Sequence, residues 1–430
     1  MEKRDPDPVD ALFDGGTMLI KYFITIIFTV AMSAALPFAQ AAEHAHDTHA
    51  AKPKHDMNKM WAEMRTRAVG MAVSMAADEK GGLWLVRMQE GHIRVSHSED
   101  GGKHFSEGVT VNPQPEAILA ENQNRPKIAV RNGVIAVTWV QALPKVFSGN
   151  IRFARSVDGG KTFSAPVTIN DDHEETSHGF STLTLDDNGH ITVVWFDGRV
   201  RDAAVKSGQE YNGSTVYYAV SEDGGASFSA NRKLADHACE CCRISMTLGV
   251  NDTPFVFWRH IFDGGMRDFA LARLDAQPRV VRASEDGWEI NACPHHGGDI
   301  AADATGSIHL AWFTGNPQHP GLFYRRIDGE KMTTTPPHAF GDLDFQPGHP
   351  AVFAHDKQVF LAWREFDGNN YRMMTSVSAD RGDTWSEARI VATTSGAADL
   401  PVFVTDAREP VIVWNSAQEG IRLFDAGGDL

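Results

Sequence analysis

Tryptophan recurs at the ends of short apolar runs along most of this 430-residue chain. Successive members of the series lie 55, 56, 63, 54, 51 and 51 residues apart, and they are Trp84, Trp139, Trp195, Trp258, Trp312, Trp363 and Trp414. The runs that they close, such as 134–139 and 191–195, are rich in β-branched residues, which is typical of buried strands rather than helices. A period of this length indicates a repeat architecture.

Each repeat has room for more than one strand. A short strand is predicted about ten residues before most of these tryptophans, joined to the next by Gly, Asn or Asp turn residues. These predicted strands are 127–130, 181–185, 244–248, 299–302, 351–354 and 402–405. A third and usually a fourth strand follow each tryptophan. We therefore predict an all-β fold, a β-propeller of about seven four-stranded blades, because radial repetition lets each blade bury both faces against its neighbours.

The blade count depends on the chain ends. The last unit, 398–430, has room for only three strands. Propellers usually close by sharing a blade between the two ends, so a strand near Arg65 to Val69 is expected to complete it. Six blades remain an alternative if one blade of the seven is split in this way.

Four copies of a turn motif lie between the predicted third and fourth strands, at 98–105, 156–163, 221–228 and 378–385. Each copy has Ser, then Asp two residues later, then Gly, and ends in Phe or Trp. A degenerate fifth copy is Ser284-Glu285-Asp286-Gly287-Trp288. This motif resembles the Asp-box of sialidase-like and BNR-repeat proteins, and the resemblance covers roughly 68–430 as architecture. The Asp accepts backbone N–H groups across the turn and Gly supplies positive φ, so these residues are structural.

The start of the chain is typical of an export signal. Lys21 precedes an apolar run over 22–36, and Ala39-Gln40-Ala41 has the small-x-small pattern of a cleavage site. Pro37 and Gln40 leave this run short of a membrane span. We expect a periplasmic or secreted protein with no stable membrane span after cleavage. The predicted divisions are a signal peptide with upstream leader (1–41), a flexible His/Met-rich segment (42–64) and the propeller domain (65–430).

The charge balance restricts the partners. Asp and Glu number 56 against 40 Lys and Arg, which gives a formal net charge of −16. This excess argues against a phosphate-neutralising surface for nucleic acid or anionic lipid. Metal ions, small molecules, glycans and proteins remain as partners.

Unusual side chains begin several of the predicted first strands. In a propeller these strands line the central channel, so their first residues meet at one mouth of it. The positions concerned are Arg125, His178, Cys242-Arg243, His296, His349 and Leu400. We predict that His178, His296 and His349 are the core ligands of a metal ion, with His295 and the four cysteines, Cys239, Cys241, Cys242 and Cys293, beside them.

Imidazole and thiolate together suit copper or zinc rather than calcium or magnesium, and copper is favoured outside the cytoplasm. The early segment supports copper, because His-rich tracts with nearby thioethers can capture it. Its residues are His44, His46, His49, His55, Met57, Met60 and Met64. The alternatives are cysteines that form disulfides, one linking the 239–242 cluster to Cys293, and histidines that only bond to loops, with no metal.

The resemblance to sialidases implies a different function. That family binds a substrate carboxylate with three arginines, since a guanidinium matches a carboxylate in bidentate fashion. Here Arg125, Arg243 and Arg364 match that role, Asp197 that of an acid, and Tyr371 that of the nucleophile. The family has a tyrosine late in the chain, yet no Tyr follows Tyr371, which puts the activity in doubt. A propeller that binds glycans or proteins without catalysis is the third alternative.

Overall fold

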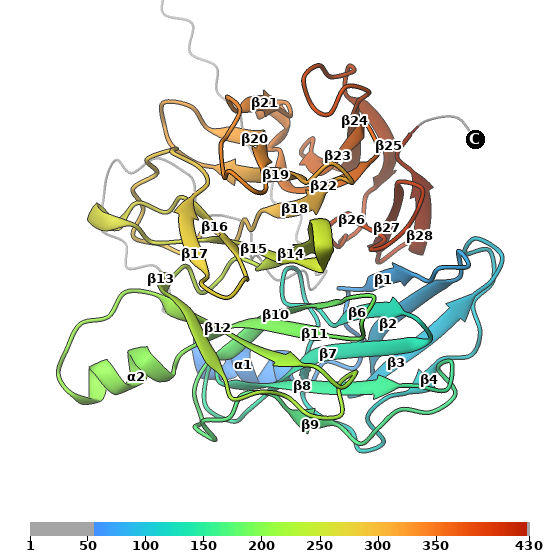
Figure 1. Ribbon diagram of the computed structural model, residues 1–430, viewed down its shortest axis with the longest axis vertical. Coiled ribbons are helices and arrows are strands. Elements are labelled where there is room, and N and C mark those ends of the chain that lie inside the picture. Colours follow the sequence, from blue (N-terminus) through green and yellow to red (C-terminus); the bar gives the residue numbers. More distant parts are fainter. Residues whose placement is uncertain (1–55, 428–430) are drawn as a thin grey trace, which may run out of the picture. The chain divides into compact units, whose positions relative to one another are not determined.

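The computed structural model describes residues 56–427 of the chain, and their strands form seven antiparallel sheets. These are the blades of a seven-bladed β-propeller, which confirms the predicted fold. In Figure 1 the blades follow one another in chain order, from blue through green and yellow to red, and the last blade lies beside the first.

Five blades have four strands in simple sequence order. Blade 1 contains β1 (Ser74–Ala77), β2 (Leu83–Gln89), β3 (His92–Ser98) and β4 (Val109–Thr110). Blade 3 contains β10 (His178–Leu185), β11 (Ile191–Asp197), β12 (Ser214–Ser221) and β13 (Arg232–Ala238). Blade 4 contains β14 (Ser245–Leu248), β15 (Pro254–Arg259), β16 (Phe269–Arg273) and β17 (Arg279–Arg282). Blade 5 contains β18 (Asp299–Ala302), β19 (Ser307–Thr314), β20 (Gly321–Asp328) and β21 (His338–Phe340). Blade 6 contains β22 (Gly348–His355), β23 (Gln358–Phe366), β24 (Tyr371–Ser378) and β25 (Arg389–Thr394).

The two remaining blades depart from this plan. Blade 2 contains β6 (Lys127–Arg131), β7 (Val134–Ala142), β8 (Gly149–Ser156) and β9 (Val167–Thr168), and β5 (Ile118–Leu119) pairs with the end of β7. Blade 7 has only β26 (Val402–Phe403), β27 (Val411–Ser416) and β28 (Gly420–Asp425). Three short 3-10 helices lie in loops, at Val250–Asp252, Asp263–Gly265 and Leu343–Phe345.

Among the described residues, no strand from the N-terminal side completes blade 7. The prediction of such a strand near Arg65 to Val69 is therefore wrong. Helix α1 (Met57–Arg65) occupies the start of this segment, and Val69 pairs with Gln89 of blade 1. The ends meet instead through β1, whose Ala77 N donates to Thr405 O at 2.8 Å. This pairing is parallel and directly joins the first strands of blades 1 and 7.

All seven repeat tryptophans lie on the second strand of their blades and are buried. Each indole N–H also has an acceptor, which is a requirement for burying a polar group. The acceptors are Asp78, Glu116, Asp197, His260, Asp286, Glu365 and the backbone oxygen of Asp399. Each blade therefore buries one repeat tryptophan whose indole N–H is hydrogen-bonded.

The four Asp-boxes lie between the third and fourth strands, as predicted. In the second copy Asp158 accepts from Thr162 N at 3.0 Å, from the Thr162 hydroxyl at 2.6 Å and from the Ser156 hydroxyl at 2.8 Å. Gly160 has a φ of 78°, and a Cβ there would lie 2.5 Å from Trp84 in the preceding blade. The turns thus need glycine both for their conformation and for packing between blades.

The degenerate fifth copy is not an Asp-box. It follows β17, the fourth strand of its blade, rather than preceding it. Asp286 accepts the indole N–H of Trp312 at 2.9 Å, and the Ser284 hydroxyl accepts from Phe269 N at 3.0 Å. The segment therefore resembles an Asp-box in sequence, but its Ser and Asp side chains have different hydrogen-bond partners.

Residues 1–55 and 428–430 are not described. The predicted signal peptide and His44, His46, His49 and His55 lie in the undescribed part. Residues 57–64 of the predicted His/Met-rich segment belong to α1, which carries Met57, Met60 and Met64. Trp61 anchors this helix, because its buried indole donates to Leu143 O at 2.9 Å.

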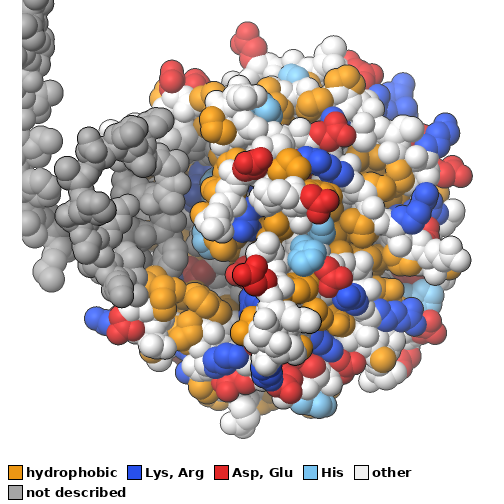
Figure 2. Space-filling model, turned by 90° about the vertical axis from the view of Figure 1, so that its left-hand side faces the viewer, with side chains coloured by type: hydrophobic (Ala, Val, Ile, Leu, Met, Phe, Trp, Pro, Cys, Tyr) orange, Lys and Arg blue, Asp and Glu red, His pale blue; other side chains and the backbone are white. Residues whose placement is uncertain are grey.

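The described surface carries charges of both signs. On the face in Figure 2 acidic and basic side chains are interspersed, and neither sign forms one continuous patch. Neither the length nor the apolar character needed to cross a membrane is found in any helix of residues 56–427.

Candidate functional site

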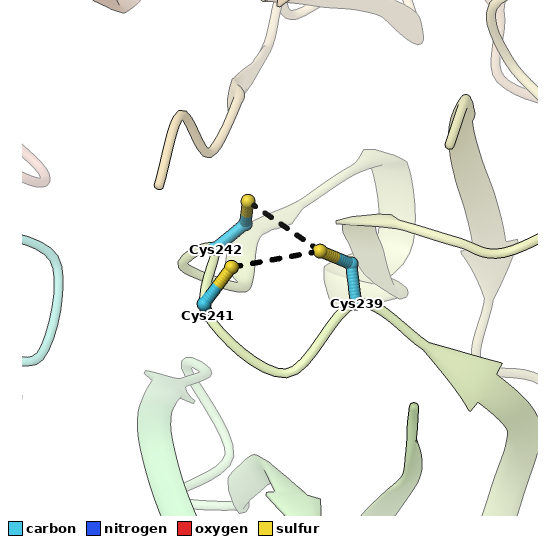
Figure 3. A group of neighbouring side chains, drawn as sticks. All are labelled: Cys239, Cys241 and Cys242. Carbon is cyan, nitrogen blue, oxygen red and sulfur yellow. Dashed lines mark hydrogen bonds between the residues drawn. The ribbon is translucent and has the colours of Figure 1, made fainter. Parts of the chain in front are cut away.

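Three cysteines meet in the loop that leads from β13 of blade 3 to β14 of blade 4. Their sulfur atoms converge in Figure 3, where Cys239 Sγ lies 3.7 Å from Cys241 Sγ and 3.9 Å from Cys242 Sγ. All three side chains are buried, and Ile261 completes the small apolar cluster around them. The loop therefore forms a closed group of soft ligand atoms, which we call the thiol trio.

Contacts on both sides fix the loop. Cys239 N donates to Arg259 O at 2.9 Å, which continues the pairing between blades 3 and 4. Glu240 forms an ion pair with Arg201 at 2.5 Å. Arg201 belongs to helix α2 (Arg199–Lys206), an insertion between β11 and β12. The loop is thus held by blade 4 on one side and by α2 on the other.

Positive charge stands beside the trio. Arg267 Nη1 lies 3.0 Å from Cys239 Sγ. Hydrogen bonds from Cys241 and Cys242, together with Arg259 and Arg267, lower the pKa of Cys239 well below its ordinary value. Burial raises the pKa of Cys242 to about 12. One thiolate is therefore stabilised by two thiol donors and two guanidinium groups.

The loop between β17 and β18 brings the fourth cysteine to this group. Cys293 is exposed. Its loop is held near the trio by Arg267, which lies 3.0 Å from Cys239 Sγ and donates to Ile290 O at 2.9 Å. All four cysteines are free thiols.

Gln123 is a residue of this region that the sequence analysis missed. Its side-chain oxygen accepts from Arg243 N at 2.8 Å and from Gly297 N at 2.7 Å, and its amide donates to His295 O. One buried amide therefore ties blade 2 to the loops that carry the cysteines. No motif marks it, and only its position two residues before Arg125 gives a hint.

His296 and His349 meet as predicted. Their rings stack with centroids 4.4 Å apart, and Phe313 stacks on the other face of His296 at 4.2 Å. Nδ1 of each ring is buried without a hydrogen-bond partner among the described residues. Burial, and then the nearby arginines Arg259 and Arg364, lower the pKa of His296 to about 3, so this ring is neutral.

His178 does not join that pair but lies in a separate group with Asp172 and Asp197, so the structure brings together two of the three predicted histidine ligands. Its Nδ1 lies 2.7 Å from Gly149 O, and its Nε2 lies 3.1 Å from Asp172 and 3.5 Å from Asp197. Burial alone lowers the pKa of His178, but the two carboxylates outweigh it and raise the pKa above its usual value. Both nitrogens therefore face oxygen acceptors in a separate ionic group, completed by Arg199.

This Asp172–His178–Asp197 group is the second set of side chains close enough to share a cation. Its carboxylates already have partners, since Asp197 receives the Trp195 indole at 2.9 Å and an ion pair with Arg199 at 2.9 Å. Asp197 is fully buried, which does not suit the role of an acid toward an external substrate. The thiol trio, with fewer competing contacts, is the better candidate.

The three arginines of the sialidase interpretation are occupied. Arg125 forms a buried bidentate ion pair with Asp399, at 2.9 and 3.1 Å. Arg243 donates to Gly298 O at 2.8 Å and to Pro350 O. Arg364 donates to Ala398 O at 3.1 Å and stacks on Tyr371, 4.6 Å from the ring centre. These contacts hold blades and loops together, and among the described residues only Nη1 of Arg243 is buried without a partner in this group of terminal guanidinium nitrogens.

Comparisons with known proteins agree on the fold. No protein family model and no curated protein matches the sequence. A PL25 polysaccharide lyase, an ulvan lyase bound to a GlcA–Rha3S saccharide, has a similar structure at 13% identity, with a TM-score of 0.54, over 84% of this chain and 94% of that one. The shared feature is the propeller. A Hadza microbial sialidase matches at 12% identity over 80% and 76% of the two chains, with a TM-score of 0.46. The Aleuria aurantia lectin matches at 13% identity over 76% and 96% of the two chains, with a TM-score of 0.45.

Proposed function

We propose that this protein is an exported β-propeller that binds a soft transition metal ion through Cys239, Cys241 and Cys242, with copper(I) favoured over zinc. The sulfur spacing carries the proposal. Two metal–sulfur bonds of about 2.3 Å separate their sulfur atoms by about 3.8 Å at a tetrahedral angle and by about 4.0 Å at a trigonal angle. Two sulfur separations within the trio are close to both values, at 3.7 and 3.9 Å.

The surroundings of the trio favour a thiolate-bound ion. Metal binding needs deprotonated sulfur, and Arg267 beside Cys239 stabilises negative charge there. Binding would release the protons that Cys241 and Cys242 hold. A set of three sulfurs suits three-coordinate copper(I), whereas zinc would recruit Cys293 or His295 as a fourth ligand.

The test is a metal titration of the full chain in its reduced form, without oxygen. We expect one tightly bound copper(I) ion per chain, detected by metal analysis after gel filtration and by ultraviolet copper–thiolate absorption. Each of the variants Cys239→Ser, Cys241→Ser and Cys242→Ser should lose tight copper binding, while the control His178→Gln should retain it. A wild-type chain that retains neither copper nor zinc would refute the proposal, as would Cys239→Ser with unchanged binding.

A second candidate is recognition of an acidic glycan at the channel mouth. Within residues 56–427, Arg243 Nη1 and the Nδ1 atoms of His296 and His349 are buried without hydrogen-bond partners, and Lys127 lies near the positive charges of Arg125 and Arg243. Burial, and then Arg125 and Arg243, lower the pKa of Lys127 to about 7. An anion would accept hydrogen bonds from these buried nitrogen atoms and offset the positive charge of Lys127, Arg125 and Arg243. The PL25 lyase holds a GlcA-containing saccharide on a similar fold, which supports the same class of ligand here.

Calorimetric titration separates this candidate from the first. An oligosaccharide that contains glucuronate should bind more tightly than its neutral counterpart, and Lys127→Met should weaken that binding. Lys80→Met is the control, because Lys80 is exposed on a turn of blade 1. Equal affinity for the acidic and neutral saccharides would refute recognition of an acidic glycan.

A further inference from the structure

The sulfur atoms of the thiol trio lie close enough to bond to one another after small movements. Cys239 Sγ is 3.7 Å from Cys241 Sγ and 3.9 Å from Cys242 Sγ, whereas the two sulfur atoms of a disulfide lie about 2.0 Å apart. In either pair each sulfur would have to move by about 1 Å. Cys239 takes part in both contacts, so it is a partner in either disulfide.

The turn in the loop favours Cys239 and Cys242 as the pair. Glu240 and Cys241 are the central residues of this turn, and Cys239 and Cys242 flank it. The first and last Cα atoms of a β-turn lie less than about 7 Å apart, and the Cα atoms of a disulfide usually lie about 4.4–6.8 Å apart. The pair also has the Cys-x-x-Cys spacing of redox-active dithiols. A bond from Cys239 to Cys241 would close a smaller and more strained ring.

Arg267 marks Cys239 as the reactive sulfur of the pair. Its Nη1 lies 3.0 Å from Cys239 Sγ, and its Nε donates to Ile290 O at 2.9 Å, which fixes the guanidinium. A cation in this position stabilises a thiolate, and the thiolate is the form of cysteine that attacks an oxidant. Cys239 is therefore placed as the nucleophile, with Cys242 as the second thiol.

Burial of the trio restricts the oxidant to a small molecule. Cys239 and Cys242 are 0% exposed and Cys241 is 6% exposed. The loop is anchored at both ends, because Cys239 N donates to Arg259 O at 2.9 Å and Arg243 N donates to the Gln123 side chain at 2.8 Å. The disulfide of another protein cannot reach sulfur atoms held in this way, whereas hydrogen peroxide is little larger than a water molecule.

We propose that hydrogen peroxide converts Cys239 and Cys242 into a disulfide, and that this reaction releases the metal ion from the thiol trio. The release rests on the proposed metal-binding function, whereas the formation of the disulfide does not. Metal binding requires thiolates, and a disulfide removes two of the three. The trio thus holds its ion only while its cysteines are reduced.

The reaction balances with peroxide as the only oxidant. The Cys239 thiolate attacks one peroxide oxygen and the O–O bond breaks, which leaves a sulfenic acid on Cys239 and a hydroxide that takes up a proton to become water. The Cys242 sulfur then attacks the Cys239 sulfur and the S–O bond breaks. The departing hydroxide takes the proton of the Cys242 thiol and leaves as a second water. The two thiols lose two electrons, which reduce the peroxide to water.

The experiment starts from the full chain in its reduced, metal-free form. The chain is treated with hydrogen peroxide in the absence of oxygen, and catalase then removes the excess. We expect thiol titration of the unfolded product to find two free thiols where the reduced chain has four. After alkylation, fragmentation of the tryptic peptide 234–243 should place the label on Cys241 and the disulfide between Cys239 and Cys242. The affinity of the oxidised chain for copper(I) should fall at least a hundredfold, and reduction should restore it.

Matched serine variants identify the pair. Cys241→Ser should still form the disulfide, whereas Cys242→Ser should stop at a sulfenic acid on Cys239 that reacts with dimedone. Cys293→Ser should lose two thiols, as the wild-type chain does, because the exposed cysteine takes no part. Circular dichroism checks that each variant is folded.

The outcomes separate the switch from the metal site. A disulfide that includes Cys293, or four free thiols after peroxide treatment, would refute the switch. An oxidised chain that binds copper(I) as tightly as the reduced chain would refute the release and leave the metal site intact. A reduced wild-type chain that binds neither copper nor zinc would refute the proposed function, and the release of an ion with it, even where the disulfide forms.

Discussion

The ion pair between Arg125 and Asp399 distinguishes a structural arginine from a substrate-binding one. Both residues are 2% exposed, and two hydrogen bonds join their side chains across 274 positions of sequence. Asp399 also accepts from Val73 N at 3.3 Å, and Arg125 donates to Val73 O at 2.7 Å. The pair therefore links blades 1, 2 and 7 at the point where the ring closes.

Asp399→Asn preserves the shape of the side chain and removes its charge. The buried guanidinium of Arg125 would keep its backbone acceptors, Val73 O and Asn122 O, but lose its counter-ion. Breaking a buried pair from one side costs about 3–5 kcal/mol, because an uncompensated charge remains in the interior. We expect a loss of this size in the free energy of unfolding.

Guanidinium unfolding followed by tryptophan fluorescence measures the loss. Asp187→Asn is the matched control, because Asp187 pairs with Arg131 at 3.0 Å but is 67% exposed, and surface pairs contribute about 0–1 kcal/mol. Replacing both partners by Met and Leu should recover much of the stability, since no buried charge is left. A loss in Asp399→Asn no larger than in the control would refute the closing role and return Arg125 to the list of ligand-binding candidates.

Three further predictions concern the frame. Gly160→Ala should lower the free energy of unfolding by about 2–4 kcal/mol, because its Cβ would lie 2.5 Å from an indole of the preceding blade. Gly159→Ala should lower it by only about 1–2 kcal/mol, because only its positive φ opposes a side chain. Equal losses in the two variants would contradict the packing argument. Trp61→Ala should destabilise the docking of α1 by about 3 kcal/mol and expose 57–65 to proteolysis, and unchanged protease resistance would contradict it. Side-chain and backbone hydrogen bonds of its turn lower the pKa of Asp380 to about 2, so its contribution to stability is present above pH 4 and lost as the pH falls toward 2. Asp380→Asn should flatten that part of the profile of unfolding midpoint against pH, and an unchanged profile would contradict it.

The sequence by itself determined the repeat and the Asp-box turns, and it predicted about seven blades with six as an alternative. These features depend on residues close together in the chain, such as Asp158 and Thr162, whose hydrogen bonds span four positions. The same locality explains why the first strands were predicted nearly in full, with 299–302 matching β18. It also explains the one false turn, because the partner of Asp286 is Trp312, far outside the motif.

Only the tertiary structure decided which side chains near the mouth act together. His178, His296 and His349 begin equivalent strands, yet Asp172 and Asp197 bind His178 separately while the other two stack. Arg125 looked free for a ligand until Asp399 was brought to it by ring closure. A repeat fixes the position of each strand, but the partner of a buried charge is set by the loops and blades that meet there. The sequence could therefore predict that the cysteines lie near this mouth, and only the fold could bring three of them within bonding distance of one ion while leaving the fourth at the surface.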